Sequence, residues 1–163
     1  MDAARPLPFA DNAVWRINGE HLVEHLPYPV AQAFFAECYR VLQPDGVLRI
    51  STPDLHKLMI IDAGDFGVAA ADVLTYHQQY HNPAADTLCA WFNDHMRLWG
   101  HTFLFDESTL FHAVRRAGFS QPEWCAYGQR RHPELQGIER HDEGVAWTHQ
   151  YVMILEATKV AAA

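Results

Sequence analysis

The sequence predicts an α/β fold that starts from a pair of parallel strands, and three segments carry this prediction. An apolar-leaning run at 13–18 precedes a helical pattern that begins near Pro29. The turn 44–46 (Pro-Asp-Gly) ends that helix, and a second apolar run, 47–51, follows directly. A strand, a crossover helix and a second strand in this order favour parallel pairing, and the carboxyl ends of such strands usually bind ligands.

The bulk composition indicates one globular domain. The chain has 163 residues, 49% of them hydrophobic, which is ample for a core. It contains no apolar run of about 18 residues and no secretory pattern, so we expect a cytoplasmic protein without a membrane partner. Twenty acidic and twelve basic residues give a net charge of −8, which argues against nucleic acid as a partner. We expect Cys38, Cys89 and Cys125 to be buried free thiols, because their number is odd and no metal spacing links them.

Hydrophobic periodicity predicts further elements after the first two strands and their helix. We expect helices at 55–61, 86–100 and 107–117, and strands at 123–127 and 151–156. Asp106 should cap the helix at 107–117 and Gly118 should end it, which makes this the clearest local signal in the chain. The stretch before Pro83 shows no single pattern. His95 lies on the apolar face of its predicted helix, where a core histidine is the default expectation.

Five segments of the chain stand out together: LPFADNAV (7–14), EHLVEHL (20–26), AECYRVLQPDGVLRISTPDL (36–55), GHTFLFDESTLFHAVRRAGF (100–119) and HPELQGIERHDEG (132–144). They resemble, in the right order, segments of bacterial class I S-adenosylmethionine (SAM)-dependent methyltransferases of the type 11 kind. The resemblance implies a Rossmann-like sheet with helices on both faces and a C-terminal antiparallel hairpin. It also implies SAM as cofactor and a small-molecule acceptor that is methylated on oxygen or nitrogen.

The sequence departs from this family at the cofactor site. The family holds SAM with a glycine-rich turn after the first strand and an acidic residue after the second. No G-x-G pair occurs among the nine glycines, and only twelve residues precede the run at 13–18. We therefore expect a single methyltransferase-like domain, 1–163, that matches the later two thirds of the family and is N-terminally incomplete. Its cofactor site would be incomplete, and the chain alone would be inactive.

The resemblance places the site where the two parallel strands end. Asn18 and Gly19 would line the methionine end of the cofactor. Glu20 and His21 would be the catalytic pair, with His21 as general base, because an imidazole accepts a proton near neutral pH. A pair with only local hydrogen bonds is the alternative. The acceptor would lie against polar residues that follow the second strand and begin a later segment: Ser51, Thr52, Asp54, His56 and His101. The polar loop at 130–141 would close over it.

The run 21–25 fits the H-x-x-E-H zinc pattern, in which two histidines share a helical face and a glutamate activates water. Pro27 closes this run after one or two turns, and the pattern needs a distant third ligand. We therefore expect no metal site, although adventitious metal binding stays an alternative. His77 and His81 have the same spacing, and the same objection applies to them.

Two functions remain open from the sequence. The first is methyl transfer by a chain completed from elsewhere, and the second is a non-catalytic binding or assembly module. In the family arrangement the strand at 13–18 lies inside the sheet, so its free edge seeks a partner. Without the missing helices, Val14, Ile17 and the Phe34 face of the crossover helix would also be partly uncovered, which predicts a homodimer or higher oligomer. A monomer whose first twelve residues fold over the edge is the alternative.

Overall fold

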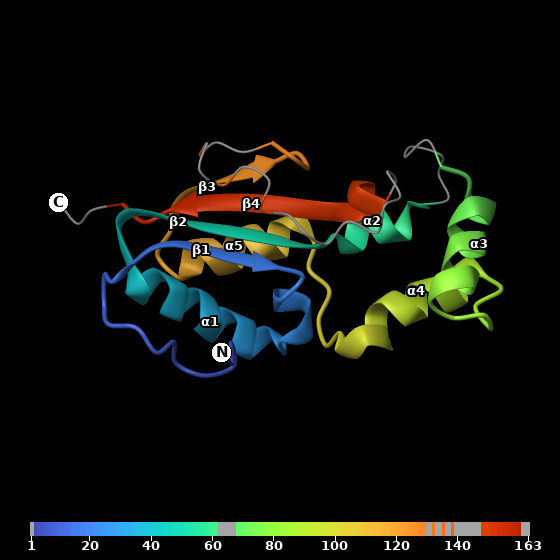
Figure 1. Cartoon of the computed structure of the whole chain (residues 1–163), viewed down its shortest axis with the longest axis horizontal. Coiled ribbons are helices and arrows are strands. Elements are labelled where there is room, and N and C mark those ends of the chain that lie inside the picture. Colours follow the sequence, from blue (N-terminus) through green and yellow to red (C-terminus); the bar gives the residue numbers. More distant parts are fainter. Residues whose placement is uncertain are drawn as a thin grey trace.

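A four-stranded sheet in the order β1-β2-β4-β3 organises the computed structural model (Figure 1). β1 (Val14–Glu20) pairs in parallel with β2 (Leu42–Pro53), and β4 (Val152–Thr158) lies antiparallel between β2 and β3 (Ser120–Cys125). The predicted α/β fold, its parallel pair and its antiparallel hairpin are confirmed. The structure describes residues 2–61, 68–129 and 148–160, together with 132, 135 and 138.

Two helices, α1 (Tyr28–Val41) and α5 (Glu107–Arg116), cover one face of the sheet (Figure 1). Their apolar faces and the inward residues of β2 and β4 form the main core, which includes Phe35, Leu48 and Leu110. The resemblance implied helices on both faces. Within the described ranges, α1 and α5 lie on the same face. Burial of this core supplies the main stabilisation of the fold, because each fully buried large apolar side chain contributes about 1.5–3 kcal/mol.

The opposite face of the sheet holds a buried ion pair. Arg49 of β2 and Glu156 of β4 stand opposite each other in the antiparallel register, and their side chains are 1% and 2% exposed. Successive strand residues point to opposite faces, so Arg49 alternates with the core residues Leu48 and Ile50. The second guanidinium nitrogen of Arg49 donates to the Gln129 carbonyl at 3.2 Å.

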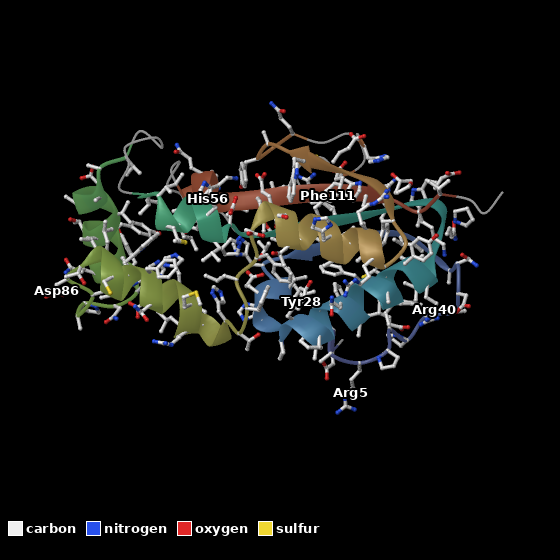
Figure 2. All side chains as sticks on the ribbon, turned by 180° about the vertical axis from the view of Figure 1, so that it is seen from behind. Arg5, Tyr28, Arg40, His56, Asp86 and Phe111 are labelled. Carbon is white, nitrogen blue, oxygen red and sulfur yellow. The ribbon has the colours of Figure 1, made fainter. Side chains whose placement is uncertain are left out.

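The N-terminal segment is fixed to α1 through Arg40, near the C-terminal end of that helix (Figure 2). The guanidinium donates to the carbonyls of Leu7 and Phe9, and Glu37 accepts from the Leu7 amide at 2.9 Å. Leu7 is thereby buried in the main core together with Phe34, which is 5% exposed. The expectation that the Phe34 face is partly uncovered is wrong, since Phe34 is buried in the main core of this chain.

The remaining helices are α2 (Leu55–Met59), α3 (Ala70–Tyr80) and α4 (Leu88–Arg97), and α3 with α4 extends beyond one end of the sheet (Figure 1). The sequence did not predict α3, whose N-cap is Ala69 without a side-chain cap and whose buried residues are few. α4 is shorter than predicted, since η3 (Leu98–Gly100) follows it with left-handed backbone. None of the described helices has the length and hydropathy to cross a membrane.

Two smaller expectations need correction. The turn predicted to end the helix at 44–46 lies instead within β2, since α1 already ends at Val41 and β2 begins at Leu42. Asp45 takes a positive φ of 64° inside this strand. The three cysteines are free as expected, but only Cys38 is buried, whereas Cys89 is exposed and Cys125 is intermediate.

Candidate functional site

A cavity of about 430 Å³ lies where β1 and β2 end. Figure 1 shows both strands running toward the end of the molecule where α3 and α4 lie. Glu20 at the end of β1 and Pro53 at the end of β2 form one wall, and aromatic residues of α3, α4 and Tyr151 form the other. Six histidines line the cavity: His21, His25, His77, His81, His95 and His101.

His21 follows β1 directly and is held in a rare backbone conformation. Its φ is 44°, in the left-handed region that non-glycine residues seldom adopt. Its amide donates to the Ser51 carbonyl of β2 at 2.9 Å, and its ring nitrogen Nδ1 lies 3.1 Å from a carboxylate oxygen of Glu24. The neighbouring strand and Glu24 thus fix the ring at the mouth of the parallel pair, which is the kind of strain that clusters at functional sites.

Glu24 is the buried anion of the site. It lies in η1 (Val23–His25) and is 0% exposed, and the hydroxyl of Thr52 donates to its Oε2 at 2.9 Å. Burial on its own would raise the pKa of Glu24, but the His21 ring and the Thr52 hydroxyl stabilise the charged form and lower the pKa overall. Glu24 is therefore a carboxylate at neutral pH.

The backbone of Glu24 joins the two halves of the site. Its carbonyl accepts hydrogen bonds from the amides of Thr102 at 2.8 Å and Phe103 at 3.1 Å. Before these residues, Trp99 and Gly100 take left-handed φ values of 60° and 81°, so the chain turns sharply after α4. This turn brings His101 back to the ends of the parallel strands.

His101 and His95 are neighbours across this turn. The Nδ1 of His101 lies 2.6 Å from the carbonyl of His95, and the His101 ring meets the His25 ring edge-on with centroids 4.9 Å apart. Burial lowers the pKa of His101, and it lowers the pKa of His95 to about 4. Both rings are consequently neutral at pH 7.

The outer wall of the cavity is an aromatic surface. Trp99 packs edge-on against His81 and His95, with ring centroids 5.2 and 5.3 Å away, and Trp91 lies 4.3 Å from His95. His77 is anchored by Asp94 at 2.8 Å. Rings arranged this way suit a flat or cationic small molecule.

The structure brings some of the predicted site residues together and separates others. Glu20, His21 and His101 line the cavity. Asn18 is exposed and Gly19 is buried next to the Ile50 side chain, and neither residue lines the cavity.

The predicted acceptor residues serve partly as supports. Thr52 orients Glu24, and Ser51 offers its carbonyl to His21. Asp54 caps α2 by accepting from the amide of His56, which is exposed on that helix (Figure 2). Most of the loop predicted to close the site, 130–141, lies outside the described residues.

Sequence reasoning missed the α3 and α4 side of the cavity. In the sequence His77 and His81 stand out only by their spacing, and Trp99 falls within the helix predicted at 86–100. Without α3 in the prediction, nothing pointed to the arrangement of these side chains around one cavity. Glu24 had a signal in the H-x-x-E-H run, but its burial depends on contacts from β2.

Comparisons with known proteins agree with this fold. Residues 1–50 match the family model described as a methyltransferase domain. A search of curated proteins gave no significant match. A possible exported protein from Bordetella parapertussis superposes with a TM-score of 0.59 at 13% identity, covering 99% of this chain and 43% of that structure.

Two solved methyltransferases are also similar. A SAM-dependent methyltransferase from Archaeoglobus fulgidus has a TM-score of 0.56 at 13% identity, with 98% of this chain and 66% of that one covered. A SAM-dependent methyltransferase from Thermotoga maritima, described as a possible histamine N-methyltransferase, has a TM-score of 0.50 at 16% identity. The match covers 98% of this chain and 62% of that one. The chain thus spans less than two thirds of each of these three structures. The predicted resemblance is confirmed, since the chain has the Rossmann-like fold of the class I SAM-dependent methyltransferases and its first 50 residues match a methyltransferase domain.

Proposed function

We propose that this chain binds the small-molecule acceptor of a SAM-dependent methyl transfer in the cavity at the ends of β1 and β2. The position of the cavity carries the proposal, because ligands of open α/β sheets bind outside the carboxyl ends of parallel strands. Its volume of about 430 Å³ also falls in the range of small-molecule sites.

His21 is the proposed general base. SAM, when bound, supplies the methyl group on its sulfonium. The imidazole of His21 would accept the proton that an acceptor hydroxyl or amine loses when it is methylated. The Glu24 carboxylate, 3.1 Å from the ring, would stabilise the resulting imidazolium. Glu20 lines the same wall and would help to orient the acceptor.

The described residues fit the acceptor better than the donor. The sequence holds no G-x-G turn to receive SAM, and Asn18 and Gly19 stand outside the cavity. We therefore expect weak binding of SAM to this chain, with a dissociation constant above about 100 μM. Calorimetric titration measures it. Binding at low micromolar concentration would show that the donor site lies on these residues after all.

Acceptor binding is tested by NMR screening of small aromatic amines and phenols against the chain. Fragments that bind should do so about tenfold more weakly to the variant Trp99→Ala, because roughly 1.4 kcal/mol of ring contact is lost. Trp124→Ala is the control, since Trp124 is similarly exposed but lies on β3, away from the cavity. Absence of any binding fragment, or equal losses in both variants, would contradict the proposal.

A second candidate function is assembly with another copy of the chain. Among the described residues, β1 is hydrogen-bonded to β2 alone within the sheet, and Trp15 on this strand is 46% exposed. An open strand edge of this kind can pair with a second strand. We therefore retain a homo-oligomer, with or without catalysis, as part of the proposal.

A further inference from the structure

The base of the cavity contains a cluster with the donor atoms of a transition-metal site. Glu24, His25 and His101 each offer one ligand atom, and these atoms lie within 4.8 Å of one another. Four ligand atoms about 2.1 Å from one zinc ion would stand roughly 3.4 Å apart, so modest side-chain rotations would bring these three atoms into coordination distance. Within the described parts of the chain, no other three His, Cys, Asp or Glu residues meet this spacing.

A buried carboxylate oxygen points to a cation at this place. The Oε1 atom of Glu24 is fully buried, and its contact with His21 Nδ1, at 3.1 Å, lacks the geometry of a hydrogen bond. Its other oxygen already takes the Thr52 hydroxyl. A buried carboxylate oxygen without a hydrogen bond is costly, and a bound cation would remove that cost.

The tautomer of His101 also favours coordination. A carbonyl cannot donate, so the 2.6 Å contact with the His95 carbonyl requires the proton on His101 Nδ1. Nε2 is then the nitrogen with the free electron pair. A ligand histidine whose other nitrogen donates to a backbone carbonyl is the usual outer-shell arrangement of metal sites.

The backbone holds the cluster in place without an ion. Glu24 and His25 belong to η1, and His101 comes from the turn after α4, yet the Glu24 carbonyl binds the amides of Thr102 and Phe103. The two segments are therefore fixed to each other before any metal binds. Only part of the H-x-x-E-H run takes part, because His21 precedes η1 with a φ of 44° and the third ligand comes from 76 residues further on.

We propose that Glu24, His25 and His101 bind a divalent transition-metal ion of the zinc type, with the remaining coordination position open to the cavity. Two imidazoles and one carboxylate favour Zn²⁺ and its neighbours over Mg²⁺ or Ca²⁺, which prefer oxygen ligands alone. The inference stands on these side chains and requires no methyl transfer, but it shares Glu24 with the proposed function, in which this carboxylate supports His21.

The test uses the full chain without an affinity tag, stripped of metal and titrated with Zn²⁺ against a chromophoric chelator. We expect one ion per chain with a dissociation constant of about 1 μM or below. We expect zinc binding to weaken at least about 100-fold in each of the variants Glu24→Gln, His25→Ala and His101→Ala. Loss of a residue that only hydrogen-bonds to a metal ligand costs less. His81→Ala is the matched control, because this histidine lines the same cavity outside the cluster, and its affinity should stay within about twofold of wild type.

Two further readouts keep the test decisive. Circular dichroism without zinc shows whether each variant folds. If Glu24→Gln does not fold, the His25→Ala and His101→Ala variants decide the test, because these two residues are partly exposed. Zinc should raise the unfolding temperature of the wild type and of His81→Ala but not of His101→Ala. Co²⁺ should give visible absorption bands that His101→Ala abolishes. The proposal is overturned if no ion binds at micromolar zinc, if the ligand variants bind normally, or if His81→Ala loses as much affinity.

Discussion

Among individual residues, the buried side chains of Arg49 and Glu156 each need the other as a partner of opposite charge. Arg49 lies in the middle of an otherwise apolar run, and Glu156 lies in the final strand, so each would be costly to bury alone. They are nearly inaccessible and face each other across β2 and β4. The pair therefore favours the register in which Arg49 of β2 lies opposite Glu156 of β4.

Breaking this pair should be more harmful than replacing it. Arg49→Met leaves the Glu156 carboxylate buried without its cation, and we expect the free energy of unfolding to fall by about 3–5 kcal/mol. The double variant Arg49→Met/Glu156→Met removes both charges and should recover part of that loss. Urea denaturation of the wild type, both single variants and the double variant measures the coupling. A single variant within about 1 kcal/mol of wild type would mean that water reaches the pair.

The candidate site could be predicted in part, residue by residue. His21 and Glu20 follow a strand, so their place at the cavity followed from the βαβ pattern. His101 was expected to touch an acceptor, but its approach to Glu24 depends on backbone hydrogen bonds between segments far apart in sequence. Asn18 and Gly19 follow from the resemblance alone, and neither of them lines the cavity. Local patterns do not encode such long-range contacts.

Among the helices, α5 shows the clearest agreement between sequence and structure. The carboxylate of Asp106 accepts from the Thr109 amide at 2.7 Å, and Gly118 takes a φ of 112° just beyond the end of the helix. By contrast, α3 begins without a side-chain cap and buries only Val73 and His77, so its pattern is weak. Helices with strong caps and wide apolar faces are predictable, whereas α3 is stabilised by packing that the sequence does not reveal.

The Asp106 cap makes a stability prediction with a pH dependence. Asp106→Ala should lower the free energy of unfolding by about 1 kcal/mol, whereas Asp106→Asn should keep most of the cap, since asparagine is an equally good N-cap. The hydrogen bonds from Thr109 lower the pKa of Asp106. The stabilisation that depends on the Asp106 charge is therefore present above the pKa of the unfolded state, about 3.9. It is lost as the pH falls through the lower pKa of Asp106 in the folded state.

Denaturant unfolding of the three proteins at several pH values measures this dependence. The difference between wild type and Asp106→Asn should shrink as the pH is lowered below about 4. A helix that starts elsewhere would leave all three proteins equally stable at every pH.

At the scale of the whole molecule, β1 forms one edge of the sheet, and no described strand pairs with its outer side. The predicted uncovered patch is smaller than expected, because Leu7 and Phe34 are buried in the core. The strand itself still presents Trp15, and backbone groups along a free edge favour pairing with another strand.

We predict a homodimer formed through β1. Light scattering coupled to size exclusion at micromolar concentration should give a mass near twice 18.6 kDa. Trp15→Lys should shift it toward the monomer, since a lysine on an edge strand opposes pairing. Trp124→Lys on β3 is the control and should leave the mass unchanged. A mass near 18.6 kDa across dilution would rule out the dimer.

The strand order has a consequence for how the chain folds as it is synthesised. β4 is made after both β2 and β3 but lies between them in the sheet. Until residues 152–158 leave the ribosome, the edge of β2 that pairs with β4 lacks its neighbour, and β3 lacks the strand that it pairs with. Of the strands that the structure describes, only β1 and β2 can pair before that point, joined by the crossover helix α1. Completion of the sheet is a late, long-range step, and during this interval exposed strand edges make the nascent chain most dependent on chaperones.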